Sequence, residues 1–398
     1  MGQGGLAVVM KPILMALVFI SASLVGCISS ESTSSSQVEA IFEFDPDKNI
    51  RTDMEIEFDA SASLPPGASL TYKWDFDNDG SYDSTGRETT WSYSEVGDYE
   101  VTLTVSDGTK SNSQTRSLEV FNASAVEPEA NAGTDLPTSD CEGEEIPSGA
   151  EYLYYICEMD KSTSSKNILA TTTVTLDGSS SEPGSSDEYL SEWEWDLDLL
   201  RDEDGDGDPK NDADLTGESV EWKEVSPGEY KIALTVTNGA GLTSIDETVV
   251  YVNYVGKWND FAIGGNTSNS PIDIEFSFQV VQNTNTGNTI RWAESELVYP
   301  KEDADQIGCP QNPNCRAKID LYGFNSTDEE AQNTSAVGAD QRSYGDCDSD
   351  TDCVGLKFSG SYQFSESYWK DGEWTFTVRN NMVNDLEIES LTIRLSYK

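Results

Sequence analysis

Two stretches of this 398-residue chain repeat one pattern, and this duplication limits the fold more than any other feature. A Trp-Asp-x-Asp motif at residues 74–77 recurs at 195–198, an offset of 121. A Gly-x-Tyr motif at 97–99 recurs at 228–230, an offset of 131, so the second copy has ten extra residues after its tryptophan. The chain therefore contains two related domains.

Each copy ends its motif with a stretch in which apolar residues alternate with polar or small ones. These apolar residues are Tyr99, Val101, Leu103 and Val105 in the first copy, and Tyr230, Ile232, Leu234 and Val236 in the second. Alternation with a period of two predicts a strand with one buried and one exposed face. Further strands are expected at 41–44, 54–58, 70–76 and 117–121, separated by Pro, Gly, Asp and Asn clusters. Several short strands at this spacing indicate an antiparallel sandwich.

The sequence Trp-Asp-Phe-Asp-Asn-Asp-Gly at 74–80, with the alternating run that begins at Gly97, resembles the polycystic-kidney-disease-type (PKD) repeat of surface proteins. We assign the two copies to residues 39–121 and 126–253. The resemblance implies immunoglobulin-like sandwiches that serve as extracellular spacers or contact proteins and sugars, and it does not imply catalysis. We expect Trp74 and Trp195 in the two cores, on the third strand.

The second copy carries an inserted segment, 136–170, which we expect to form a hairpin stapled by Cys141 and Cys157. Residues 255–398 are not a third copy, but alternating runs predict another sandwich there. Within this part, 372–378 and 386–395 resemble the closing strands of the proprotein-convertase P domain, a jelly roll attached to secreted peptidases. The predicted fold is thus all-β, with two immunoglobulin-like (PKD) sandwiches followed by a jelly-roll-like β-sandwich.

Residues 1–27 have the features of a secretory signal: Lys11, a short apolar run, and the ending Leu-Val-Gly-Cys. This ending resembles the lipobox of prokaryotic lipoproteins, which makes Cys27 the lipid-bearing first residue of a surface protein anchored to the cell membrane. An ordinary cleaved signal is the alternative. The Ser-rich segment 28–38 then predicts a flexible tether. The lipobox indicates a prokaryote, and the acidity and domain content favour an archaeon.

Six cysteines remain after Cys27, an even number that predicts three disulfides in a secreted chain. Six cysteines allow fifteen connectivities, and we favour pairing of sequence neighbours: Cys141 with Cys157, Cys309 with Cys315, and Cys347 with Cys353. Four glycosylation sequons also fit an extracellular chain, at Asn122, Asn266, Asn325 and Asn333.

The charge balance excludes several functions. With 24 Lys and Arg against 73 Asp and Glu, the formal net charge is −49, which argues against binding to nucleic acid or to an anionic membrane surface. The chain contains no His, so His-based catalysis and His-ligated metals are excluded. The chain is 36% hydrophobic and 10% aromatic, which supports packed cores rather than disorder.

Three loops place aspartates at alternate positions, a spacing that can converge on calcium because this ion takes six to eight hard oxygen ligands. The first has Asp75, Asp77, Asp79 and Asp83; the second has Asp202, Asp204, Asp206, Asp208 and Asp212; the third has Asp346, Asp348, Asp350 and Asp352. None has the glutamate that ends an EF-hand loop. The alternative is a solvated acidic turn. Structural calcium is the one cofactor that the sequence predicts.

We found no phosphate-binding loop, nucleophile elbow or catalytic cysteine motif, so the sequence predicts a non-enzymatic protein. The favoured function is a lipid-anchored surface protein whose PKD-like stalk presents the last sandwich to a protein or glycan. The alternatives are an envelope spacer without a specific ligand, and an accessory module of a separately encoded secreted hydrolase.

Overall fold

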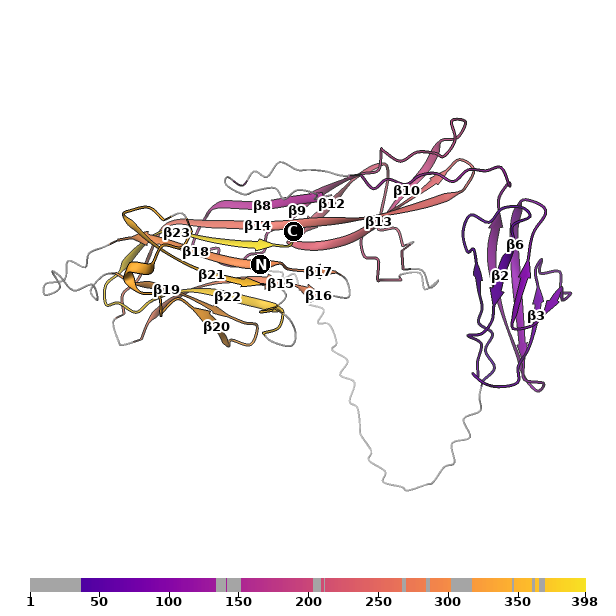
Figure 1. Cartoon of the computed structure of the whole chain (residues 1–398), viewed down its shortest axis with the longest axis horizontal. Coiled ribbons are helices and arrows are strands. Elements are labelled where there is room, and N and C mark those ends of the chain that lie inside the picture. The colour runs from indigo at the N-terminus through magenta and orange to yellow at the C-terminus, as the bar shows by residue number, and fades with distance from the viewer. Residues whose placement is uncertain are drawn as a thin grey trace, which may run out of the picture.

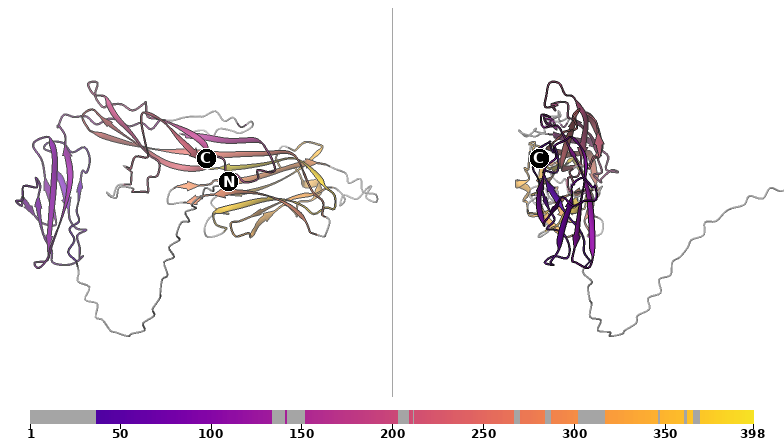
Figure 2. Two further views of the ribbon diagram at one scale, coloured as in Figure 1. Left: turned by 180° about the vertical axis from the view of Figure 1, so that it is seen from behind. Right: turned by 90° about the vertical axis from the view of Figure 1, so that its right-hand side faces the viewer.

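The computed structural model describes residues 37–133, 141, 152–202, 209–210, 212–266, 270–283, 287–301, 317–345, 347–359, 362–364 and 369–398. Apart from one 3-10 turn at Ala339–Gln341, the regular elements of these residues are β-strands, which confirms the all-β prediction (Figures 1 and 2). No helix among them is long and apolar enough to cross a membrane.

The first sandwich occupies the predicted residues and packs two antiparallel sheets around an aromatic core. Its strands are β1 (Glu43–Asp45), β2 (Ile56–Asp59), β3 (Thr71–Asp75), β4 (Ser84–Thr85), β5 (Glu88–Trp91), β6 (Gly97–Ser106) and β7 (Ser111–Val120). One sheet has the order β1-β2-β5 and the other β4-β3-β6-β7. Trp74 lies on the third strand, fully buried, and contacts Phe42 edge to face with ring centroids 5.1 Å apart.

The rest of the chain forms one continuous body. Its first strands are β8 (Tyr152–Lys161), β9 (Thr172–Asp177), β10 (Leu190–Asp196), β11 (Leu215–Thr216), β12 (Ser219–Val225), β13 (Gly228–Asn238) and β14 (Thr243–Ile263). The remaining strands are β15 (Ile272–Val280), β16 (Gln282–Asn283), β17 (Asn288–Thr289), β18 (Trp292–Pro300), β19 (Ile319–Phe324), β20 (Glu330–Asn333), β21 (Thr351–Ser359), β22 (Gly372–Asn380) and β23 (Leu386–Ser396).

The second sandwich repeats the local structure of the first. Trp195 lies on β10 as Trp74 lies on β3, and both are fully buried. The indole N–H of Trp74 donates to the carbonyl of Gly86 (2.9 Å), and that of Trp195 donates to the carbonyl of Gly217 (3.1 Å). The expected core position of both tryptophans is therefore confirmed, and each one fixes the hairpin that follows it.

One long strand runs through the expected boundary between residues 253 and 255. Both lie inside β14, a 21-residue strand that belongs to the second sandwich at its start and to the C-terminal sandwich at its end. β13 pairs with residues 243–252 of β14, and β23 pairs with residues 254–263. The change of pairing partner thus falls at the expected boundary, but the two sandwiches share this strand and are continuous there.

Most of residues 136–151 of the inserted segment lie outside the described residues, so the expected hairpin stays a prediction. Among the described residues, β8 pairs in parallel with residues 250–258 of β14, and with no second strand of the insertion. A strand has two edges, and β8 overlaps the stretches paired with β13 and with β23. Hence β13 and β23 lie end to end along one edge of β14, and β8 covers the junction from the other edge.

The C-terminal sandwich packs a second sheet, β15-β22-β19-β20, under the shared one (Figure 1). One hydrophobic core runs through the second and C-terminal sandwiches, from Ala132 to Tyr397, whereas the first sandwich has a separate core. The contacts of the first sandwich with this body include a pair of hydrogen bonds. Asn49 donates to the carbonyl of Thr243 (2.8 Å) and accepts from its N–H (2.9 Å).

Candidate functional site

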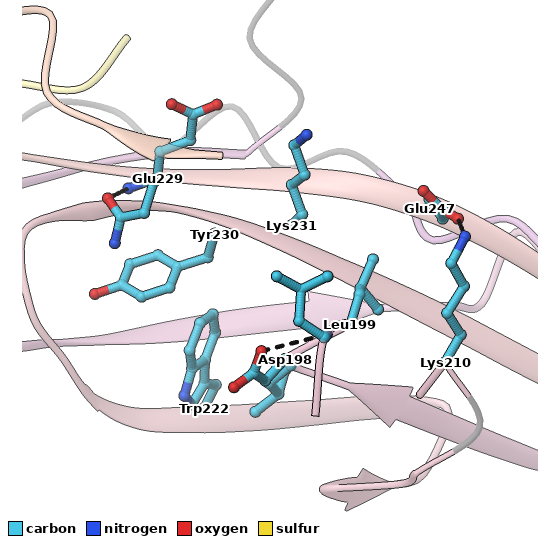
Figure 3. Close-up of a pocket in the computed structure, with 11 residues that line it drawn as sticks. Asp198, Leu199, Lys210, Trp222, Glu229, Tyr230, Lys231 and Glu247 are labelled. Carbon is cyan, nitrogen blue, oxygen red and sulfur yellow. Dashed lines mark hydrogen bonds and ion pairs between the residues drawn. The ribbon is translucent and has the colours of Figure 1, made fainter. Parts of the chain in front are cut away.

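A cavity of about 430 Å³ opens beside the loop that follows β10, where the second sandwich meets the β16–β17 hairpin (Figure 3). Its lining comes from this loop, from β12, β13 and β14, and from β17. The lining residues are Leu197, Asp198, Leu199, Leu200, Lys210, Trp222, Glu229, Tyr230, Lys231, Glu247 and Asn288.

Two aromatic rings form one wall of the cavity. Trp222 on β12 and Tyr230 on β13 meet edge to face, with ring centroids 5.0 Å apart at 80°. Both side chains are half-buried, and the Tyr230 hydroxyl donates to the carbonyl of Ser226 (2.9 Å). Burial raises the pKa of Tyr230 to about 12, so its hydroxyl stays protonated near neutral pH. The wall is thus apolar, neutral and held in place.

The first copy shows why this space exists. There Trp91, the equivalent of Trp222, stacks on Phe76 with ring centroids 4.7 Å apart at 15°. In the second copy the position of Phe76 is occupied by Leu197, which has no ring to cover Trp222. Where the first sandwich has the ring of Phe76, the second thus has the smaller side chain of Leu197, which lines the cavity.

The rim of the cavity is polar and nearly balanced in charge. Lys210 pairs with Glu247, and the backbone N–H of Glu229 donates to the side chain of Asn288 (3.0 Å). The Glu229 carboxylate accepts the hydroxyl of Thr289 (3.1 Å), which ties β13 to the β16–β17 hairpin. Two lysines face three acidic residues in the lining, whereas the whole chain has one cation for every three acids.

Two further depressions continue from this cavity. One, of about 370 Å³, shares Tyr230 and Asn288 with it. The next, of about 400 Å³, shares Leu169 and Ala170 with the second. The three therefore follow one another along the surface, and Tyr230 stands between the first two.

Among the aspartates of the first acidic loop, three converge. Asp75, Asp77 and Asp83 each place a carboxylate oxygen within 4.8 Å of the others, the one such group of three among the described residues. Asp79 is not part of the group; its backbone N–H donates to Asp75 and to Asp77, both at 3.2 Å. The predicted ligand set is thus brought together in part.

The second acidic loop falls largely outside the described residues, including Asp204, Asp206 and Asp208. The side chain of Asp202 is exposed and that of Asp212 is partly exposed. The residue that draws attention is instead Asp196 on β10, which is 4% exposed. In the sequence, Asp196 is part of the repeated tryptophan motif, and it was not among the predicted ligands for that reason.

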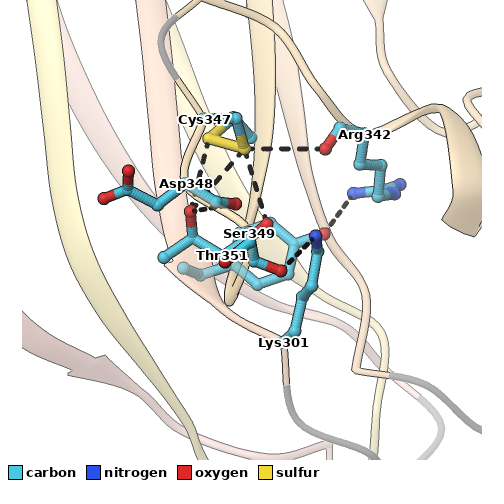
Figure 4. The surroundings of a disulfide bond; sticks show 8 residues. Lys301, Arg342, Cys347, Asp348, Ser349 and Thr351 are labelled. Atoms are coloured by element: carbon cyan, nitrogen blue, oxygen red, sulfur yellow. Dashed lines mark hydrogen bonds between the residues drawn. A yellow bond between two sulfur atoms is a disulfide. The ribbon is translucent and has the colours of Figure 1, made fainter.

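In the third acidic loop, Asp348 and Asp350 are exposed, and Asp346 lies outside the described residues. A lysine already contacts this loop: Lys301 Nζ donates to the carbonyl of Ser349 (2.9 Å), as Figure 4 shows. The backbone N–H of Lys301 also donates to the carbonyl of Asp350 (2.8 Å). Both contacts of Lys301 are with backbone carbonyls of the loop, and the structure does not test the predicted metal site.

Two predicted disulfides are confirmed, Cys141–Cys157 and Cys347–Cys353. Cys157 lies on β8, so the first disulfide holds the strand that covers the sandwich junction. Cys309, Cys315 and the predicted lipidation site Cys27 lie outside the described residues.

The four sequons differ in exposure. The side chain of Asn122 is exposed, whereas those of Asn266 and Asn333 are partly buried. Asn325 is 5% exposed, and its side-chain oxygen accepts the backbone N–H groups of Thr327 (3.0 Å) and Glu329 (2.7 Å). Of the four, Asn122 is therefore the most accessible acceptor in the folded chain.

Comparison with known proteins identifies part of the chain. Residues 38–121 match the family model described as the PKD domain. The chain therefore contains a PKD domain. The match covers the first sandwich, in agreement with the motifs at Trp74 and Gly97. No curated protein matches the sequence.

Comparison with solved structures finds several similar ones at low sequence identity. One, described as carbohydrate-binding modules from the β-sandwich superfamily, has 13% identity and a TM-score of 0.20, covering 90% of this chain and 96% of its own. Fibronectin(III)-like modules of Clostridium thermocellum CbhA have 11% identity and a TM-score of 0.22, covering 54% and 95%. Bacteroides ovatus SGBP-B, in complex with a mixed-linkage heptasaccharide, has 10% identity and a TM-score of 0.16, covering 87% and 94%. These superpositions are too poor to transfer a site, so the cavity is interpreted from its own residues.

Proposed function

We propose that this protein is a non-enzymatic, glycan-binding surface lipoprotein. In this proposal a lipid on Cys27 anchors the chain outside the cell membrane, and the PKD domain acts as a spacer. The two fused sandwiches then hold a saccharide in the cavity beside Trp222. The lipobox-like ending at Cys27 supports the anchor, and the two disulfides are typical of an oxidising compartment.

The observation that carries this proposal is the aromatic wall formed by Trp222 and Tyr230 beside a nearly balanced polar rim. Saccharides combine apolar C–H faces, which pack on aromatic rings, with hydroxyls that donate to carboxylates and accept from ammonium groups. The cavity volume of about 430 Å³ lies in the usual range of ligand sites, roughly 300 to 1,000 Å³.

A neutral ligand fits the electrostatics best. The net charge of −49 repels a polyanion. A small cation is not favoured either, because Glu247 on the rim already pairs with Lys210. Because further depressions continue past Tyr230, an oligosaccharide is favoured over a single sugar.

The test is a screen of the chain from residue 28 onward against neutral polysaccharides, followed by calorimetry with oligosaccharides of the best ligand. Trp222→Ala should weaken binding at least tenfold, equivalent to about 1.4 kcal/mol. Trp91→Ala is the matched control, because it removes the equivalent ring from the first sandwich and should leave the affinity unchanged. Absence of binding throughout the screen, or equal effects of the two substitutions, would refute the proposal and favour the spacer function.

A further inference from the structure

The cavity beside Trp222 lies along an edge of β13. Side chains alternate between the two faces of a strand, so Tyr230 points to one face of β13, and Glu229 and Lys231 point to the other (Figure 3). All three residues line the cavity. A cavity that is bordered by both faces of a strand must lie at one of its edges.

That edge is the one that faces away from β14. β14 pairs with residues 228–237 of β13 along the other edge. On the outer edge, β10 pairs with residues 233–238, and the side chain of Asn288 on β17 accepts the N–H of Glu229 (3.0 Å). Among the described residues, no strand pairs with residues 230–232 on this outer edge. The sheet therefore has a gap there.

The gap begins where the chain leaves β10. The last residue of β10, Asp196, is opposite Ala233. The N–H of the next residue, Leu197, donates instead to the side chain of Asp214 (2.7 Å). Leu197 also lines the cavity. The ladder thus stops at Asp196, and the cavity takes the place of its continuation.

The gap leaves the main chain of Lys231 uncovered. In an antiparallel strand, every second residue directs its N–H and C=O groups to the same edge. The N–H of Glu229 points to the outer edge, and Lys231 lies two residues further on. Neither the N–H nor the C=O of Lys231 has a partner on that edge in the part of the chain that the structure describes. Lys231 thus presents one donor and one acceptor to the cavity.

The side chain of Lys231 points away from the aromatic wall (Figure 3). It packs over Gly287, where an added Cβ would lie 2.5 Å from Lys231 Cε. The main chain of Lys231 therefore lies between its own side chain and the wall formed by Trp222 and Tyr230. A ligand that packs on this wall meets the main chain of Lys231 rather than its ammonium group.

We propose that the main chain of Lys231 holds the saccharide through two neighbouring hydroxyls of one sugar ring. One hydroxyl donates to the carbonyl of Lys231 and the other accepts its N–H, because a hydroxyl can take either part. The apolar face of the same ring packs on Trp222. The inferred ligand class is a neutral saccharide with two adjacent free hydroxyls. This inference rests on the proposed glycan-binding function and adds to it the groups that select the sugar.

An extended peptide is the other kind of ligand that pairs with a strand edge, and the gap is too short for it. From Glu229 to Ala233 a strand extends about 13 Å. Asn288 closes this stretch at one end and β10 closes it at the other. Strand addition gains its affinity from a row of main-chain hydrogen bonds, whereas this edge offers those of Lys231 alone. A compact sugar ring suits the gap better.

Amide hydrogen exchange of the unaltered chain, followed by NMR, is the first test. The ligand is the oligosaccharide that binds best in the screen described above. At saturation it should slow exchange of the Lys231 amide by about tenfold or more, because the N–H becomes hydrogen-bonded. Glu100 occupies the equivalent position of the first sandwich, at the offset of 131, and its amide should not change. An unchanged Lys231 amide in the saturated chain would overturn the inference.

Two substitutions separate the main chain of Lys231 from its side chain. Lys231→Pro removes the N–H at an edge position, where proline is tolerated, and should weaken saccharide binding in calorimetry by about threefold or more. Lys231→Ala keeps the N–H and should change the affinity by less than about twofold. Equal effects of the two would assign the contact to the side chain and refute the inference.

Glu100→Pro is the matched control for the effect of proline on a strand edge. It makes the same change at the equivalent position of the first sandwich and should leave saccharide affinity unchanged. Thermal unfolding shows whether the Lys231→Pro chain is folded. If it is not, the exchange measurement on the unaltered chain decides the question alone.

The failures of this inference and of the glycan function look different. If no saccharide binds, both fail. If a saccharide binds and Trp222→Ala weakens it, but the Lys231 amide stays unprotected, the glycan function stands and only the inference falls. Protection of the Lys231 amide by an extended peptide, without saccharide binding, would refute both and assign the edge to strand addition.

Discussion

The side chain of Asn253 fastens the point where the two fused sandwiches meet. It lies between the last residue of β14 paired with β13 and the first paired with β23, and is 2% exposed. Its oxygen accepts the backbone N–H of Tyr397 (2.8 Å) and that of Lys398 (3.3 Å). Asn253→Ala would remove this acceptor and leave both donors unpaired.

The magnitude follows from the burial of those donors. A buried donor left without a partner costs about 1 to 3 kcal/mol. The bond from Tyr397 is buried and that from Lys398 only partly, so the second donor regains water more easily. We expect a loss of about 2 to 3 kcal/mol, which corresponds to a fall of roughly 5 to 10 °C in the melting temperature of a body this large.

Differential scanning calorimetry of the whole chain is the appropriate assay. Because the two cores are separate, the chain should show one transition for the PKD domain and one for the fused sandwiches. Asn253→Ala should lower only the second transition and keep it single. Asn112→Ala is the control: Asn112 accepts the N–H of Ala40 (2.8 Å), so its loss should lower only the first.

Two results would refute the reasoning. If the second transition of Asn253→Ala split in two, the sandwiches would not share a cooperative core. If it moved by less than about 1 °C, the contacts of Asn253 would contribute too little to fasten the junction.

Two further predictions concern other parts of the chain. Arg342, fully buried, pairs with Asp320. Arg342→Met should cost about 3 to 5 kcal/mol in urea unfolding, because the buried carboxylate then keeps only the more distant Lys318 Nζ (3.8 Å) as a cationic partner, and adding Asp320→Asn should recover part of the loss. Hydrogen bonds from Lys110 and Thr109 lower the pKa of Asp107 to about 2, from its usual 3.8. The charged form is therefore favoured in the folded state, so this contribution to PKD-domain stability is present above pH 4 and falls as the pH drops toward 2. An NMR titration should give a midpoint near 2, which Thr109→Val should raise; an unchanged midpoint would contradict the assigned cause.

The candidate site could be predicted only in part. The motif around Asp75 was found because its residues are close in sequence, and three of its four aspartates do converge. The cavity beside Trp222 was not predicted. In the first copy the ring of Phe76 stacks on the equivalent tryptophan, and the second copy has no ring at that position. The signal that could have revealed it is the difference in side-chain size at equivalent positions of the two copies, Phe76 in the first and Leu197 in the second.

The sequence alone determined part of this protein: many of the strands, the two core tryptophans and the extent of the PKD domain. These depend on local periodicity and on motifs whose residues lie within one hairpin. Only the tertiary structure decided how the elements combine. That β14 serves two sandwiches, and that β8 joins it in parallel, both depend on long-range pairing. Such pairing is set by the packing of whole sheets, because one apolar strand can satisfy many different neighbours.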